Sequence, residues 1–151
     1  MIDEISLEIL RILQEKARIP NIEVSRQVGL APSAVLERIR KMEKQGIIDG
    51  YEVRLNPGRF ASSQIAFVHV LVGGRQDAAA DIGEQLAAVP EIQEVHYVAG
   101  DDSYLIKIRA ADTADLGRLL RTRVQSISGV TATRTEPVLA TYKETARIPI
   151  P

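Results

Sequence analysis

The sequence contains no cysteine, which excludes disulfide bonds, thiolate chemistry and zinc sites with Cys ligands. It also lacks any apolar run near the ~20 residues that a transmembrane helix requires. Its first residues, Met1 to Glu4, lack the cationic segment that begins a secretory signal. We therefore expect a cytoplasmic protein that makes no contact with a membrane.

The sequence has little net charge, with 19 Lys and Arg residues against 20 Asp and Glu residues. This balance argues against binding to nucleic acid by bulk attraction, so any DNA binding requires a local basic patch. The hydrophobic fraction of 45% and the charged fraction of 26% are typical of a folded globular protein. A chain of 151 residues can form one domain or two small ones.

Apolar residues recur at helical spacing in the first third of the chain, and capping and turn residues divide this part into three helices. Asp3 is placed to cap the first helix, and Asn21 is placed to cap the second. Gly29 suits the tight turn that ends the second helix, and Pro32 suits the first turn of the third. The second and third helices together match a helix-turn-helix over residues 21 to 45.

The third helix has an apolar face of Val35, Ile39 and Met42 and an opposite face that is basic. Arg and Lys neutralise phosphates and donate to guanine O6 and N7, so the basic face predicts contact with double-stranded DNA. Glu37 can accept from cytosine, but it can instead form an intrahelical pair with Lys41, and the whole face can be merely solvated. The candidate DNA-binding residues are Ser33, Ala34, Glu37, Arg38, Arg40, Lys41 and Lys44.

A domain boundary follows the helices. Tyr51, Val53 and Leu55 alternate with polar residues, which predicts a linker strand leading out of the first domain. Asn56-Pro57-Gly58 is a turn signal. We therefore divide the chain into a helix-turn-helix domain (1–49), a linker strand and hinge (50–63) and a second domain (64–151).

The second domain contains one pattern twice, at a shift of about 38 residues. Strands are predicted near residues 65, 92, 104 and 130, with a helix inside each pair. Two β-α-β units in series predict a ferredoxin-like βαββαβ fold, in which helices cover one face of an antiparallel sheet, and an α+β class for the chain. Apolar residues on both faces, such as Val70 and Leu71, indicate that another subunit buries the second face. The N-terminal domain is the alternative cover for that face.

The sequence offers no clear set of catalytic or metal-binding residues. His69 and His96 fall in predicted strands that are not neighbours in this fold, so we expect no metal site and a structural or surface role for both. There is no phosphate-binding glycine loop, nucleophile elbow or His-Glu-x-x-His motif, and no cofactor is implied. Paired acids such as Asp101-Asp102 are poor evidence of acid-base catalysis by themselves.

Several short motifs follow one another in a specific order. The first part contains Ile2-Asp3-Glu4-Ile5, Val28-Gly29-Leu30-Ala31-Pro32-Ser33, Leu36-Glu37-Arg38-Ile39-Arg40-Lys41-Met42-Glu43 and Gly46-Ile47-Ile48-Asp49-Gly50-Tyr51. The second part contains Pro90-Glu91-Ile92, Val98-Ala99-Gly100-Asp101-Asp102-Ser103-Tyr104-Leu105 and Gly129-Val130. Together these motifs resemble the Lrp/AsnC family, also called feast/famine regulatory proteins, along nearly the whole chain.

The resemblance implies a winged helix-turn-helix domain, a ligand-sensing domain, and a homodimer formed through the sheets that assembles further to a tetramer or octamer. It also implies a small effector, usually an amino acid, that binds between dimers near the loop from Gly100 to Tyr104. An acid in this loop can pair with an α-amino group, and a hydroxyl can bond a polar end; an ordinary hairpin turn is the alternative. The candidate effector-binding residues are Gly100, Asp101, Asp102, Ser103, Tyr104 and Thr133.

Two positions depart from the family's usual pattern. Ala31 stands where Ser usually caps the recognition helix, so a side-chain acceptor is missing and we expect modest DNA affinity per helix. Oligomerisation would then supply much of the binding strength. The loop from Gly100 to Tyr104 has Asp-Ser where the usual sequence has Tyr-Asp, which leaves the identity of the effector open.

We therefore predict a sequence-specific DNA-binding transcription regulator, not an enzyme, whose assembly or DNA binding responds to a small effector such as an amino acid. One alternative is an architectural DNA-binding protein that needs no effector. The other is a small-molecule-binding enzyme on the ferredoxin-like half, against which the lack of a nucleophile, a metal set and a catalytic base counts.

Overall fold

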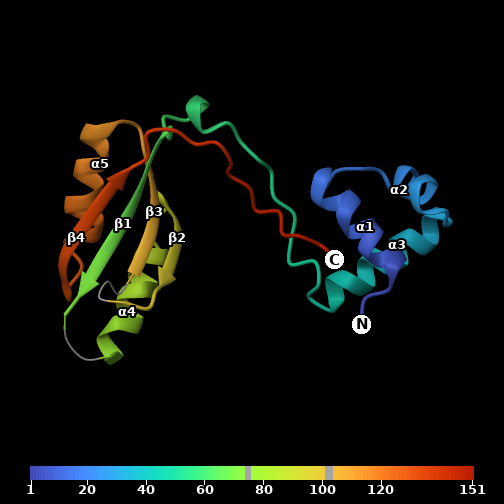
Figure 1. The fold of residues 1–151 in the computed structure, drawn as a ribbon, viewed down its shortest axis with the longest axis horizontal. Coiled ribbons are helices and arrows are strands. Elements are labelled where there is room, and N and C mark those ends of the chain that lie inside the picture. The colour runs from blue at the N-terminus through green and yellow to red at the C-terminus, as the bar shows by residue number, and fades with distance from the viewer. Residues whose placement is uncertain (74–75, 101–103) are drawn as a thin grey trace. The chain divides into compact units, whose positions relative to one another are not determined.

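The structure consists of two compact units (Figure 1). This computed structural model describes residues 1–73, 76–100 and 104–151, with residues 76–80 described by their backbone alone. The first unit comprises residues 1–54 and 143–151, and the second comprises residues 55–142. Within the described ranges, no helix has the length and apolar character needed to cross a membrane.

Three helices build the first unit: α1 (Glu4–Glu15), α2 (Asn21–Val28) and α3 (Pro32–Lys44). Each helix contributes a fully buried side chain to a shared apolar core, Ile9 from α1, Val24 from α2 and Val35 from α3. Ile39 and Met42 complete the face that α3 turns toward this core. Their spacing along the sequence predicted that face.

Asp3, Gly29 and Pro32 take the positions that the sequence predicts for them. The Asp3 carboxylate accepts a hydrogen bond of 2.8 Å from the Ser6 amide and caps α1. Gly29 ends α2 in the left-handed region, at a φ of 70°, where a glycine avoids the steric cost of a side chain. Pro32 is the first residue of α3, and Ala31 before it gives the helix no side-chain cap.

The prediction that Asn21 caps α2 is wrong. Asn21 is the first residue of the helix, and the extended residue Pro20 stands before it. The Pro20 carbonyl accepts hydrogen bonds from the amides of Glu23, at 2.9 Å, and Val24, at 3.2 Å. The helix therefore begins one residue earlier than a capping Asn21 would allow.

The second unit is a four-stranded antiparallel sheet with helices on one face (Figure 1). Its strands, β1 (Gln64–Val72), β2 (Ile92–Tyr97), β3 (Tyr104–Ala110) and β4 (Val130–Pro137), have the spatial order β2-β3-β1-β4. Its helices are α4 (Gln76–Ala87) and α5 (Thr113–Leu119), and α5 continues as one π-helical turn, Leu120–Val124. The order of elements and strands confirms the ferredoxin-like prediction.

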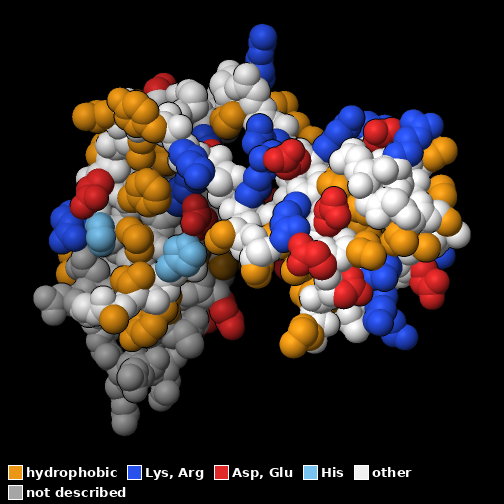
Figure 2. Space-filling model, turned by 45° about the vertical axis from the view of Figure 1, so that its right-hand side comes forward, with side chains coloured by type: hydrophobic (Ala, Val, Ile, Leu, Met, Phe, Trp, Pro, Cys, Tyr) orange, Lys and Arg blue, Asp and Glu red, His pale blue; other side chains and the backbone are white. Residues whose placement is uncertain are grey.

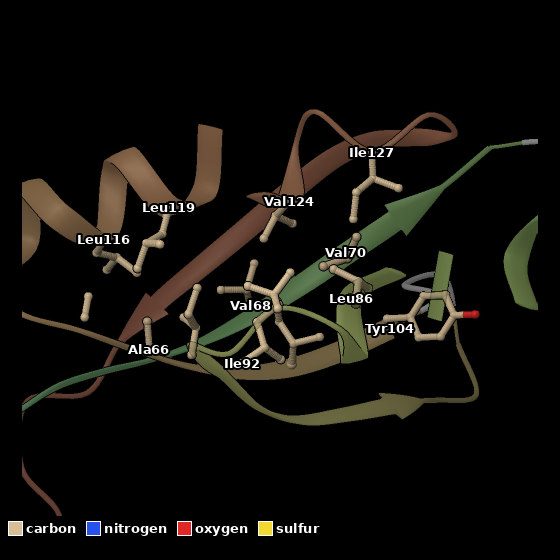
Figure 3. Close-up of a cluster of buried hydrophobic side chains, with 14 of the residues drawn as sticks. Ala66, Val68, Val70, Leu86, Ile92, Tyr104, Leu116, Leu119, Val124 and Ile127 are labelled. Atoms are coloured by element: carbon tan, nitrogen blue, oxygen red, sulfur yellow. The ribbon is translucent and has the colours of Figure 1, made fainter. Parts of the chain in front are cut away.

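The core of the second unit lies between the sheet and its helices (Figure 3). Ala66, Val68 and Val70 alternate along β1 and are fully buried on this side. Leu86 of α4 and Val124 of the π-helical turn are also fully buried. These two residues occupy equivalent positions in the repeated sequence pattern, so both repeats bury the same helix position.

The predicted linker strand is not formed. The residues from Tyr51 to Leu55 carry no regular secondary structure, and Tyr51, Val53 and Leu55 are 50%, 84% and 64% exposed. A strand needs a neighbour that supplies hydrogen-bond partners for its backbone. No strand among the described residues pairs with this segment, so the alternating pattern alone does not produce a strand.

Residues 143–151 pack with the first unit, although the sequence pattern placed them at the end of the domain 64–151. After β4 the chain leaves the sheet, and Ile148 forms hydrogen bonds with Gln14 of α1. The segment has no helical or strand periodicity. A pattern without periodicity carries no information about the surface on which a segment packs.

The second sheet face is not covered by the helices of its own unit. Phe67 and Leu71 of β1 and Leu105 of β3 lie on it, and the histidine side chains lie between hydrophobic and charged ones on the surface shown in Figure 2. β3 separates the strands that carry His69 and His96, so the two are not on neighbouring strands, as predicted. The described residues contain no cluster of His, Asp and Glu suited to a metal ion. Burial of this face against another subunit stays a prediction.

Candidate DNA-binding surface and effector site

The outer face of α3 is exposed and basic. Arg40, Lys41 and Lys44 project from the side of the helix opposite the buried residues Val35 and Ile39. Within the described part of the chain, none of these three cations forms a hydrogen bond or an ion pair. Their charges are therefore available to neutralise the phosphates of an approaching duplex.

The first turns of α3 carry the other predicted contacts with bases. Ser33 and Glu37 are exposed, and Ala34 is half-buried. The intrahelical pair between Glu37 and Lys41, which the sequence offers as an alternative, is not formed among the described residues. Glu37 is thus free to accept a hydrogen bond from a base edge.

Arg38 differs from the other predicted DNA-binding residues because its guanidinium is already bound. Its Nη1 donates to Oδ1 and Oδ2 of Asp3 at 2.9 and 2.7 Å and to the Ser6 hydroxyl at 3.0 Å. The hydrogen bond from Arg38, together with that from the Ser6 amide, lowers the pKa of Asp3 to about 2. The pair therefore links the start of α1 to α3. At 100° per residue, Arg38 lies between the outer and buried faces of α3, whereas Arg40 lies on the outer face. This difference in helical angle could have distinguished the two arginines from the sequence alone.

We expect Arg38→Ala to lower the thermal stability of the first unit and to leave the salt dependence of DNA binding unchanged, because Arg38 holds Asp3. Arg40→Ala should instead flatten the plot of log affinity against log salt by about 0.9 for each phosphate that it no longer neutralises. Fluorescence anisotropy at several salt concentrations measures both slopes. The Arg38–Asp3 pair stays intact in a measurement near neutral pH, because the Asp3 carboxyl, with a pKa of about 2, is ionised there. An equal flattening in the two variants would show that Arg38 binds phosphate.

A groove of about 670 Å³ runs along one flank of α3, between this helix and the first residues of the chain. Glu37 and Lys41 line it, with Met42 and Ile47 as apolar residues of the same lining. Gln45 also lines the groove and was missed by sequence reasoning. It lies one helical turn beyond Lys41, so the same 100° spacing could have found it.

Tyr51 attaches the start of the interdomain segment to α3. Its hydroxyl donates to Oε1 of Glu43 at 3.0 Å. Partial burial of the phenol and the neighbouring Glu43 carboxylate raise the pKa of Tyr51 to about 12. The hydroxyl therefore keeps its proton, and so its role as a donor, at any physiological pH.

The predicted effector loop is described only at its two ends, because Asp101, Asp102 and Ser103 lie outside the described residues. Gly100 has a φ of 127°, and a Cβ added to it would meet no atom of the described residues within 4 Å. Tyr104 is 5% exposed and belongs to the core of the second unit (Figure 3). Its ring meets that of Tyr97 edge to face, with centroids 5.4 Å apart.

Thr133 lies at the same level of the sheet as Tyr104. Val70 on β1 pairs with Tyr104 on one side and with Thr133 on the other. At a strand spacing of ~4.8 Å, the two residues are about 10 Å apart. The Thr133 hydroxyl accepts a hydrogen bond of 2.9 Å from Nε2 of Gln125. Gln125 follows the π-helical turn, and no sequence pattern indicated that it would reach β4.

Two family models match the chain, and together they cover both units. A model described as "Winged helix-turn-helix DNA-binding" matches residues 2–49, and a model described as "Lrp/AsnC ligand binding domain" matches residues 65–148. A leucine-responsive regulatory protein of Haemophilus influenzae is 41% identical over 145 residues, which are 95% of this chain and 87% of that protein.

Solved structures give the same result for the fold. A transcriptional regulator of Neisseria meningitidis in complex with L-methionine is 28% identical, with a TM-score of 0.93 over 99% of this chain and 97% of that one. A feast or famine regulatory protein of Mycobacterium tuberculosis, also complexed with L-methionine, is 30% identical, with a TM-score of 0.88 over 100% of both chains. The similarity therefore extends through both units.

Proposed function

The chain belongs to the Lrp/AsnC family of transcription regulators, and on this basis we propose that α3 reads an operator whose occupancy is controlled by an amino acid. The observation that carries the DNA-binding part is the row of exposed, unpaired cations Arg40, Lys41 and Lys44 on α3. A helix of this kind, presented by a helix-turn-helix, fits the major groove of B-DNA.

Within this interface the residues have different roles. Arg40, Lys41 and Lys44 neutralise phosphates, while Ser33 and Glu37 approach base edges near the start of α3. Ala34 offers a methyl-sized apolar contact on the same side. Arg38 acts through Asp3, because its guanidinium is committed to that carboxylate. It is thus a positioning residue that sets α3 against α1.

Two copies of the chain would associate through the sheet face that carries Phe67, Leu71 and Leu105. Apolar side chains on a face that the unit's own helices leave uncovered gain free energy when a partner removes them from water. A symmetric dimer presents two α3 helices, so it reads two half-sites about one helical turn, or a multiple of it, apart. Further assembly to a tetramer or octamer adds DNA contacts and affinity.

The effector is an amino acid that binds near the loop from Gly100 to Tyr104. Two relatives of known structure were solved with L-methionine. No described residue would meet a Cβ on Gly100 within 4 Å, and the loop residues Asp101, Asp102 and Ser103 offer acids for an α-amino group and a hydroxyl for a polar end. Thr133, at the same level of the sheet as Tyr104, offers a second hydroxyl.

A selection from fragments of genomic DNA tests this function. The full-length protein should retain fragments in which footprinting shows two protected half-sites, about one helical turn or a multiple of it apart. One or more amino acids should change the amount of each fragment retained. Retention of all sequences equally would favour the architectural alternative, and retention of none would contradict DNA binding.

We further propose a cytoplasmic regulator that catalyses no reaction. The named relative is a regulatory protein, and the motifs of phosphate-binding, hydrolytic and metal-dependent enzymes are missing from the sequence. Among the described positions no group of His, Asp and Glu could hold a metal ion, so the alternative of a metal-dependent enzyme on the second unit has no support there.

A further inference from the structure

The chain passes twice between its two units. One passage leads from the first unit into β1, and the other leads from β4, which ends at Pro137, back to residues 143–151 of the first unit. The second passage can restrict the motion of the units only if its end, residues 143–151, stays bound to the first unit. The contacts of residues 148–151 with α1 therefore decide whether the chain has one connection between its units or two.

Gln14 of α1 holds the backbone of Ile148 by two reciprocal hydrogen bonds. The Gln14 Nε2 donates to the Ile148 carbonyl at 2.9 Å, and the Ile148 amide donates to the Gln14 Oε1 at 2.9 Å. The side-chain amide thus satisfies both backbone groups of one residue, as a neighbouring strand would. Three residues before Gln14, on the same face of the helix, the Arg11 guanidinium donates to the main-chain oxygen of Pro151.

The docked segment, Ile148-Pro149-Ile150-Pro151, suits this surface chemically. The residues before each proline are biased toward an extended backbone, so little conformational entropy is lost on docking. Proline has no N–H, so its backbone can only accept hydrogen bonds. At Pro151 the main-chain oxygen accepts from the Arg11 guanidinium, a group that can only donate. Ile148 has both an N–H and a carbonyl, and it contacts the Gln14 side-chain amide, which both donates and accepts. Ile150 is half-buried in the docked state.

We propose that the Arg11 and Gln14 face of α1 is a docking surface for residues 148–151, and that the docked tail is a second tether restricting the motion of the DNA-binding unit relative to the sheet unit. This inference goes beyond the proposed function and requires neither DNA nor an effector. The contacts are exposed to water, so they open more easily than the core. Covalent attachment raises the effective concentration of the tail at α1 and favours rebinding.

Hydrogen exchange on the full chain tests the docking. The Ile148 amide should exchange at least about tenfold more slowly in the wild type than in Gln14→Glu, since that variant replaces the donor to the Ile148 carbonyl with a carboxylate oxygen that repels this carbonyl and so weakens the docking of the whole segment. Glu15→Gln is the matched control, because Glu15 is the exposed neighbour of Gln14 and its side chain forms no hydrogen bond or ion pair in the described structure. Equal exchange in the wild type and Gln14→Glu would overturn the proposal.

A second pair of variants separates backbone docking from side-chain packing. Ile148→Pro removes the N–H that donates to Gln14, whereas Ile148→Ala keeps it and changes a side chain that is 70% exposed. The NMR resonances of the Gln14 side-chain amide, which donates to the Ile148 carbonyl, should move toward those of a solvated glutamine in the proline variant and stay near their wild-type positions in the alanine variant. The same movement in both variants would contradict a backbone-mediated contact.

The tether is tested by single-molecule energy transfer between dyes at Gln27→Cys on α2 and Glu84→Cys on α4. The chain has no native cysteine to compete for the labels, and excess unlabelled protein leaves one labelled chain in each assembly. The distribution of transfer efficiency should broaden in Gln14→Glu and stay unchanged in Glu15→Gln. An unchanged distribution in Gln14→Glu would overturn the tether even if the exchange experiment shows docking.

Discussion

Replacing Arg40 and Lys41 together with alanine should lower operator affinity by about 100-fold or more at low salt, which is the largest effect we expect from surface substitutions. Both side chains are exposed and unpaired among the described residues, so their removal costs the fold little. In a dimer the double substitution leaves four phosphates without a protein cation. At about 0.9 for each phosphate, the plot of log affinity against log salt flattens by about 3.6.

The control for this experiment is Arg121→Ala with Arg123→Ala. These two arginines are exposed, belong to the π-helical turn of the second unit and form no side-chain hydrogen bond or ion pair in the described part of the chain. Their removal changes the net charge by the same amount, so it measures the effect of overall charge alone. If the two double variants show the same affinity and the same slope, α3 is not the DNA-binding element.

The cognate amino acid should raise the melting temperature of the protein by roughly 10 °C or more. A ligand at about 100 times its dissociation constant adds ~2.7 kcal/mol of stability. Each kcal/mol raises the melting temperature of a domain of this size by about 4–8 °C. A thermal-shift screen of the twenty L-amino acids measures this, with each D-enantiomer as its control. No shift with any amino acid would favour a DNA-binding protein without an amino-acid effector.

Thr133→Val then tests the effector site. Valine keeps the shape of threonine and removes the hydroxyl, and a tenfold weaker dissociation constant would reduce the ligand-induced stabilisation to about 1.4 kcal/mol. Thr135→Val is the matched control, because Thr135 is two residues along β4 on the same sheet face. Each variant is compared with its own ligand-free melting temperature. Equal ligand-induced shifts in both variants would place the effector away from Thr133.

The helix-turn-helix could be predicted from the sequence because local residues determine it. Gly29 adopts a left-handed conformation that suits few other residues. Pro32 starts α3 where a missing amide has no cost. The error at Asn21 is also local, since Pro20 supplies the carbonyl that begins the helix one residue earlier. The outer face of α3 followed from the spacing of its buried residues.

The ferredoxin-like sheet could be predicted because its pattern occurs twice. Leu86 and Val124 are buried at equivalent positions of the two repeats, so periodicity identified the face that each helix turns toward the core. The alternation of Tyr51, Val53 and Leu55 gave the same type of signal, yet no strand formed there. Hydrogen bonds between strands depend on a partner that the segment's own sequence does not specify.

The sequence by itself therefore determined which side chains on the outer face of α3 are basic, where α3 starts and which order the four strands take. Only the tertiary structure decided that Arg38 binds Asp3, that Tyr104 enters the core and that residues 148–151 dock on Gln14. The first group depends on residues a few positions apart, where backbone geometry fixes the relation between side chains. The second group depends on contacts between residues far apart in the chain, 35 positions for Arg38 and Asp3 and 134 for Ile148 and Gln14, and no local sequence pattern specifies such a relation.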